Sequence, residues 1–133
     1  MIESAAIFLL SACALPGQAS SPHFENDILP LLGRHGCNAS GCHGKAEGQG
    51  GFKLSVLGSD PDADRAAIVK EGRGRRVSPS SPDESLLLRK ASGRVAHGGG
   101  VKIPSGSEDY QAMRAWIAIG SPAGSPDAPT LAS

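Results

Sequence analysis

The sequence is poor in aromatic residues and has no surplus of charge of either sign. Only 4% of its 133 residues are aromatic, with one tryptophan, one tyrosine and three phenylalanines. A small domain with so few large apolar side chains usually needs a disulfide, a metal or a cofactor to complete its core. The 13 basic and 13 acidic side chains give a formal net charge of zero. Nucleic-acid-binding proteins carry a clear basic surplus, so the sequence predicts no nucleic-acid partner.

Long apolar runs are also missing, and the run from Ala5 to Leu15 is too short to span a bilayer. It precedes Gly17-Gln18-Ala19, which has the small-x-small pattern of a signal-peptidase site. Residues 1–19 are therefore predicted to be a signal peptide, although no lysine or arginine precedes the run. Leu10-Ser11-Ala12-Cys13 also resembles a bacterial lipobox, which would end the leader at residue 12 and tether Cys13 to the membrane by a lipid. Both alternatives predict export to the periplasm or cell envelope.

Glycine and proline make up about a fifth of the chain and divide it into short segments. Apolar periodicity and capping residues predict four helices. They cover Phe24–Leu32, about 62–70, a segment that begins at Ser81 and Pro82, and a segment from Ser107 to Gly120. Little sheet is expected, so the fold class is all-α, with one domain over residues 20–120. Residues 121–133, rich in Pro, Gly, Ser and Ala, predict a disordered tail.

Two of these helices carry specific expectations. Pro30 lies within the first and predicts either a kink or a late start, and Ser20, Ser21 or Asn26 is the expected cap. In the last helix, Tyr110, Met113, Trp116 and Ile117 share one face and are expected to pack in the core.

The stretch Cys37-Asn38-Ala39-Ser40-Gly41-Cys42-His43-Gly44 places a histidine directly after the second of two cysteines. Covalent attachment of haem c uses two thiols and an adjacent imidazole, and its usual motif has two residues between the cysteines. Four small or turn-forming residues intervene here and can form a looped insertion. Haem would also complete the thin core. Two alternatives stay open: a zinc site with His97, His35 or a carboxylate as fourth ligand, and a Cys37–Cys42 disulfide.

Several motifs along the chain together resemble one family. They are the first predicted helix, the C-x-x-x-x-C-H-G stretch, Gly51-Phe52-Lys53-Leu54-Ser55, Gly74-Arg75-Arg76-Val77, Ser85-Leu86-Leu87-Leu88, His97-Gly98-Gly99-Gly100 and the Tyr110–Gly120 segment. This combination is similar to the C-x4-C-H branch of the Planctomycetes-type cytochrome c domains, which are related to class I cytochrome c. The resemblance implies a cytochrome c-like fold, with several short helices and glycine-rich loops around one covalently bound haem c.

By this resemblance, Cys37 and Cys42 are the thioether positions and His43 is the proximal iron ligand. The class I pattern has a Met-Pro pair before the last helix, where this chain has Ile103-Pro104. Isoleucine cannot bind iron, so His97 becomes the candidate distal ligand. The glycines beside it let the backbone approach the haem closely.

Three arginines near the middle of the chain have two interpretations. Arg73, Arg75 and Arg76 are expected either to pair with haem propionates or acidic partner groups, since guanidinium suits carboxylates, or to form a solvated basic loop.

The sequence therefore predicts an exported monohaem c-type cytochrome that carries single electrons through Fe(III)/Fe(II) cycling, with an unidentified redox protein as partner. No acid–base constellation typical of an enzyme is present, so no catalysis is expected. An open sixth position on the iron would permit weak peroxidase or gas-sensing activity. The alternative from another class is an envelope-tethered interaction module, stapled by a Cys37–Cys42 disulfide or by zinc, without redox function.

Overall fold

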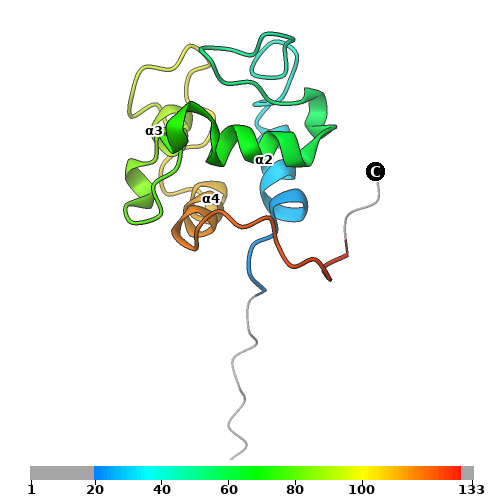
Figure 1. Ribbon diagram of the computed structural model, residues 1–133. Coiled ribbons are helices and arrows are strands. Elements are labelled where there is room, and N and C mark those ends of the chain that lie inside the picture. Colours follow the sequence, from blue (N-terminus) through cyan, green and yellow to red (C-terminus); the bar gives the residue numbers. More distant parts are fainter. Residues whose placement is uncertain (1–19, 130–133) are drawn as a thin grey trace, which may run out of the picture.

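The computed structural model describes residues 20–129, and within this range the chain is helical (Figure 1). Its elements are η1 (Phe24–Ile28), α1 (Leu29–Arg34), η2 (Val56–Gly58), α2 (Pro61–Val69), η3 (Glu71–Gly74), η4 (Pro82–Glu84), α3 (Leu86–Ala91) and α4 (Glu108–Ala118). The described residues form no strand, only an isolated bridge between Gln49 and Phe52. The all-α expectation is therefore confirmed. The predicted leader, Cys13 and residues 130–133 lie outside the described range.

The first predicted helix forms in two parts. A π-helical turn, η1, is followed by α1, which carries Pro30 in its first turn, where a missing N–H breaks no helical hydrogen bond. None of the three residues expected to cap this helix does so. His23 occupies the N-cap, and its Nδ1 accepts a hydrogen bond of 3.3 Å from the N–H of Asn26. Gly36, with φ of 69°, follows the helix end and turns the chain toward Cys37.

The second helix, α2, agrees with the prediction for residues 62–70. Asp60 caps it by accepting a hydrogen bond of 3.1 Å from the N–H of Ala63. Asp64 in its first turn is buried, and its carboxylate accepts hydrogen bonds from the N–H and hydroxyl of Ser55. Burial raises the pKa of Asp64, while both hydrogen bonds from Ser55 oppose the shift. These contacts join α2 to the loop that follows the Cys/His stretch.

The third predicted helix is interrupted, which corrects the sequence prediction. Pro82–Glu84 forms only a short 3₁₀ turn, and α3 begins at Leu86 because Ser85 has a non-helical ψ of 129°. Ser81, the predicted cap, makes no capping hydrogen bond. The hydroxyl of Ser85 accepts a hydrogen bond of 2.9 Å from the N–H of Ser78, which stabilises the corner.

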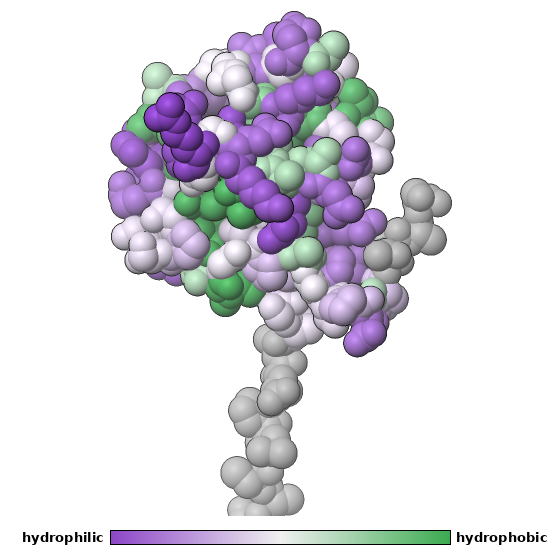
Figure 2. Space-filling model, viewed as in Figure 1, coloured by the Kyte–Doolittle hydropathy of each residue, from purple (hydrophilic) through white to green (hydrophobic). Residues whose placement is uncertain are grey.

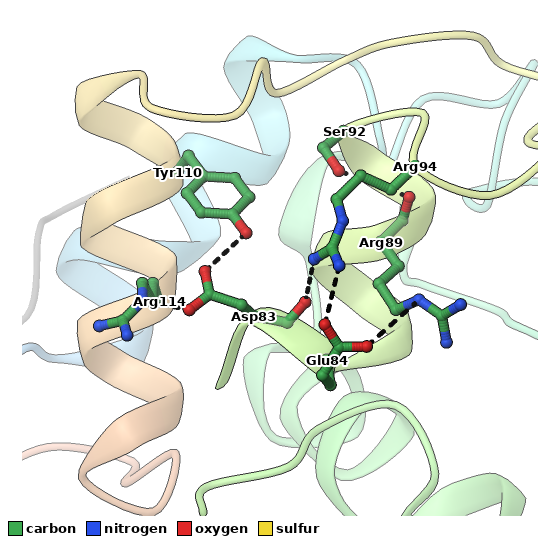
Figure 3. A network of polar contacts seen from close by, with 7 residues as sticks. All are labelled: Asp83, Glu84, Arg89, Ser92, Arg94, Tyr110 and Arg114. Carbon is green, nitrogen blue, oxygen red and sulfur yellow. Dashed lines mark hydrogen bonds and ion pairs between the residues drawn. The ribbon is translucent and has the colours of Figure 1, made fainter. Parts of the chain in front are cut away.

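A polar network holds this corner against α4 (Figure 3). The carboxylate of Asp83 accepts hydrogen bonds of 2.8 Å from both Arg114 Nε and the Tyr110 hydroxyl. Arg94 donates from Nη1 to the Asp83 carbonyl at 2.6 Å and from Nη2 to the Glu84 carboxylate at 2.8 Å. The hydrogen bonds from Arg114 and Tyr110 hold the pKa of Asp83 below its ordinary value. The network thus fixes η4 and the end of α3 relative to α4.

The last helix, α4, agrees with its prediction in position and in its buried face. Ser107 caps it by accepting a hydrogen bond of 3.1 Å from the N–H of Tyr110. The four residues predicted to share the apolar face are all buried: Tyr110, Met113, Trp116 and Ile117. The rings of Trp116 and Phe24 lie 5.5 Å apart and pack α4 on η1.

The folded region extends beyond the predicted boundary at Gly120. The N–H of Phe24 donates to the carbonyl of Ala123 at 2.9 Å, and Trp116 Nε1 donates to the carbonyl of Pro122 at 2.8 Å. Arg65 binds the carbonyl of Ser121 through Nε and Nη2, at 3.0 and 2.8 Å. These hydrogen bonds place the start of the predicted tail against η1, α2 and α4.

Among residues 20–129, no helix combines the length and apolar character needed to cross a bilayer. Figure 2 shows a face on which hydrophilic residues predominate around smaller apolar areas.

Candidate functional site

The Cys/His stretch forms a compact loop after α1. The N–H of His43 donates to the carbonyl of Cys37 at 3.0 Å, and the N–H groups of Cys42 and Gly44 both donate to the carbonyl of Ala39. A Cβ atom on Gly44 would lie 2.1 Å from a backbone oxygen of this loop, so only glycine fits there. The loop brings Cys37, Cys42 and His43 to the wall of one cavity.

His43 is oriented by the loop that follows it. Its Nδ1 lies 2.9 Å from the carbonyl oxygen of Phe52, and because a carbonyl only accepts, Nδ1 carries the proton. The neutral imidazole therefore has an unprotonated Nε2, the nitrogen able to bind a metal. Gly48, with φ of 68°, allows the turn that presents this carbonyl. Burial lowers the pKa of His43, although the hydrogen bond to Phe52 opposes the shift.

His97 has the same arrangement on its own loop. Its Nδ1 lies 2.8 Å from the carbonyl oxygen of Gly100, so the neutral ring again has an unprotonated Nε2. A Cβ atom on Gly99 would lie 3.1 Å from Cε1 of this ring, closer than ordinary contact. Lys90 in α3 donates to the carbonyl of Ala96 at 2.7 Å and holds the start of the loop.

The imidazoles of His43 and His97 both line the cavity, and their ring planes are nearly parallel. Their centroids lie 6.3 Å apart and their planes differ by 8°. Metal–imidazole bonds measure about 2.0–2.1 Å. With each ring centre about 1.1 Å beyond its nitrogen, two imidazoles that bind one metal from opposite sides have centroids about 6.3 Å apart. The centroid spacing of the two rings therefore equals the spacing expected for two imidazoles bound to one metal.

The cavity has a volume of about 720 Å³, within the range of about 300–1,000 Å³ that is usual for ligand and cofactor sites. Apolar side chains make much of its wall. They are Leu32 from α1, Leu86, Leu87 and Ala91 from α3, Met113 from α4, and Phe52 and Ile103 from loops. The core, which has few large apolar side chains as the composition predicts, thus surrounds a space large enough for an apolar group.

The charged residues that line the cavity are all cationic. In the described part of the chain they are Arg75, Arg76, Lys90 and Lys102, with no aspartate or glutamate among the lining residues. The two arginines were candidates from the sequence, whereas the lysines were missed because no local pattern marks them. The N–H groups of Lys102 and Ile103 both bind the carbonyl of Ala91, which places Lys102 beside α3. This cationic set suits a ligand that carries carboxylates.

Cys37 and Cys42 are free thiols, each half-buried. Burial and the neighbouring Cys42 raise the pKa of Cys37, while the charge of Lys102 opposes the shift. No disulfide joins the two in this structure. Among residues 20–129, no three His, Cys, Asp or Glu side chains lie together in a group that could hold a metal ion. Haem iron requires only two axial protein ligands.

The remaining predicted residues differ in their outcome. Arg73 is exposed and does not line the cavity, in line with the solvated alternative. Nε2 of His35 lies 2.7 Å from Asp109 and ties α1 to α4. Met113 is buried in the core, as predicted, and also contributes to the cavity wall. Ile103 is fully buried and lines the cavity as well.

A scan against protein-family models found no matching family, and searches of curated proteins and of solved structures found no similar chain. The function is therefore inferred from the residues that line the cavity.

Proposed function

We propose that this chain is an exported monohaem c-type cytochrome that carries single electrons to or from a redox protein partner. The main support is the pair of parallel imidazoles, His43 and His97, 6.3 Å apart on a cavity that both cysteine thiols also line. Each histidine donates its Nδ1–H to a backbone carbonyl, which leaves Nε2 available for iron.

In this proposal each of the four residues has a distinct role. Cys37 and Cys42 would hold the haem through two thioethers, since the addition of each S–H across one vinyl group needs no oxidant. His43 and His97 would hold the iron through their Nε2 atoms. Bound haem supplies a one-electron Fe(III)/Fe(II) couple.

The cavity wall would control this couple in two opposing ways. Two histidine ligands would favour ferric iron more than a histidine and a thioether sulfur do, and the Nδ1–H bonds to carbonyls strengthen both imidazoles as donors. The cationic residues Arg75, Arg76, Lys90 and Lys102 neutralise carboxylates and favour the less positive ferrous state. We expect a reduction potential below that of a histidine–methionine cytochrome.

Purification of the full chain from a bacterium that matures c-type cytochromes tests the proposal. The reduced protein should show sharp α and β bands, and its haem should stay with the chain in acid acetone. The double variant C37A/C42A should release any haem into acid acetone. The variant S40A, which changes an exposed residue between the cysteines, should retain it.

Two results would contradict the proposal at different levels. A wild-type protein without haem would refute the cytochrome function as a whole. Haem retained in acid acetone by C37A/C42A would refute the thioether positions while leaving haem binding intact.

A further inference from the structure

Arg76 is buried, with only 5% of its surface exposed, although it carries a charge. Its Nη1 donates to the carbonyl of Ala67 in α2, and its Nη2 donates to the carbonyl of Gly51, each at 2.8 Å. None of the ion pairs formed within residues 20–129 includes Arg76. Burial of a charge is costly, and no carboxylate of the described chain pairs with it here, so the two carbonyls are the groups of the described chain that satisfy the buried guanidinium.

The contacts of Arg76 lead to His43 in two steps. The guanidinium lies 4.6 Å from the centroid of the Phe52 ring, and the Phe52 ring lies 4.5 Å from the His43 ring. The carbonyl of Phe52 accepts the Nδ1–H of His43, and the carbonyl that Arg76 binds belongs to the preceding residue, Gly51. Arg76 therefore holds both the backbone and the ring of the residue that orients His43.

We propose that Arg76 is a positioning residue for His43, which fixes the Gly51–Phe52 segment to α2 so that the Phe52 carbonyl keeps accepting the Nδ1–H. The role of His43 as an iron ligand rests on the proposed function, whereas the hydrogen bond belongs to the chain alone. A ligand's hydrogen bond on its far nitrogen sets its orientation and donor strength. Arg76 thus influences the orientation and donor strength of His43 without contacting it directly.

The chemistry of arginine suits this role better than that of lysine. The planar guanidinium donates along two directions and stacks on a ring at the same time, whereas an ammonium is a compact point charge. Arg75 is the matched control, because it is adjacent, has the same charge and lines the same cavity, yet is exposed.

Proton exchange at the two histidines tests the inference. The exchange rates of the Nδ1–H protons of His43 and His97 would be measured by NMR in the reduced holoprotein, for the wild type, R76K and R75K. In R76K we expect exchange at His43 to accelerate about tenfold, the factor that corresponds to one hydrogen bond of about 1.4 kcal/mol. Exchange at His97 should stay unchanged, and R75K should alter neither proton.

Equal acceleration at both histidines in R76K would mean general loosening and would overturn the positioning role, as would an unchanged rate at His43. A protein without haem would refute the proposed function but not this inference, because the same protons can be followed in the haem-free chain. If R76K does not fold, F52L keeps the carbonyl but removes the ring beneath Arg76. Exchange in F52L should then accelerate at His43 alone, and an unchanged rate would contradict the inference.

Discussion

Replacing Gly48 by alanine should damage the site by moving the acceptor of His43. Gly48 has φ of 68°, and a left-handed conformation costs a residue with a Cβ roughly 1–2 kcal/mol. The new Cβ would lie 2.6 Å from the Phe52 oxygen, which would have to retreat to the 3.4 Å of ordinary contact. That oxygen accepts the Nδ1–H of His43 at 2.9 Å, and loss of one hydrogen bond adds roughly 1 kcal/mol. The total destabilisation should be about 2–3 kcal/mol.

Gly50 supplies the matched control in the same loop. It also has a positive φ, 59°, but a Cβ there would meet no atom within 4 Å. G50A should therefore cost only the conformational strain, roughly 1–2 kcal/mol. Urea unfolding followed by the fluorescence of Trp116, the only tryptophan, measures both free energies of unfolding.

A second readout separates the hydrogen bond from general strain. If His43 binds iron as proposed, a weaker Nδ1–H bond makes it a poorer donor, so G48A should raise the reduction potential of the holoprotein, whereas G50A should leave it unchanged. Equal costs of unfolding and equal potentials for the two variants would refute the role assigned to Gly48.

Three further outcomes are expected. If His97 binds iron as proposed, H97A should let the reduced holoprotein bind carbon monoxide, and an unchanged visible spectrum would exclude His97 as a ligand. Leu57 is 79% exposed and has a φ of 55°, in the left-handed region that asparagine adopts more readily than leucine. L57N should therefore raise the free energy of unfolding in urea by about 0.5–1 kcal/mol. A lower free energy of unfolding would contradict backbone strain at Leu57. Arg114 and Tyr110 lower the pKa of Asp83, so its ionised form stabilises the fold above pH 3.8 and this contribution disappears as the pH falls through the lowered value. D83N should have a lower free energy of unfolding than the wild type at neutral pH, and this difference should disappear in acid. A difference that does not change with pH would contradict the lowered pKa of Asp83.

The helices that the sequence predicts well are those with strong local signals. α2 has an aspartate cap and a proline at its start, and α4 has a serine cap and four apolar residues on one face. The break at Ser85 has no such signal. It depends on a hydrogen bond from Ser78, and the sequence alone made Pro82 appear to be the start of a continuous helix.

The site residues differ in the same way, because some belong to one local motif and others depend on contacts that are distant in the sequence. Cys37, Cys42 and His43 are adjacent in one motif, so their common location on one wall was expected. His97 was inferred only from the lack of a methionine before Pro104. Its hydrogen bond to Gly100, like that of His43 to Phe52, uses a backbone carbonyl, which any residue provides and no motif reveals.

The neutral net charge of the chain hides a separation of charge within the fold. Acidic residues pair with exposed arginines away from the cavity: Asp109 with Arg34, and Glu84 with Arg94. The side chains that line the cavity are left with positive charge alone in the described range. Like charges around one space repel each other, and a ligand with two carboxylates would remove that repulsion. A composition that predicts no nucleic-acid partner therefore does not exclude an anionic ligand, because a ligand in the cavity interacts with the charges on its wall and not with their sum over the chain.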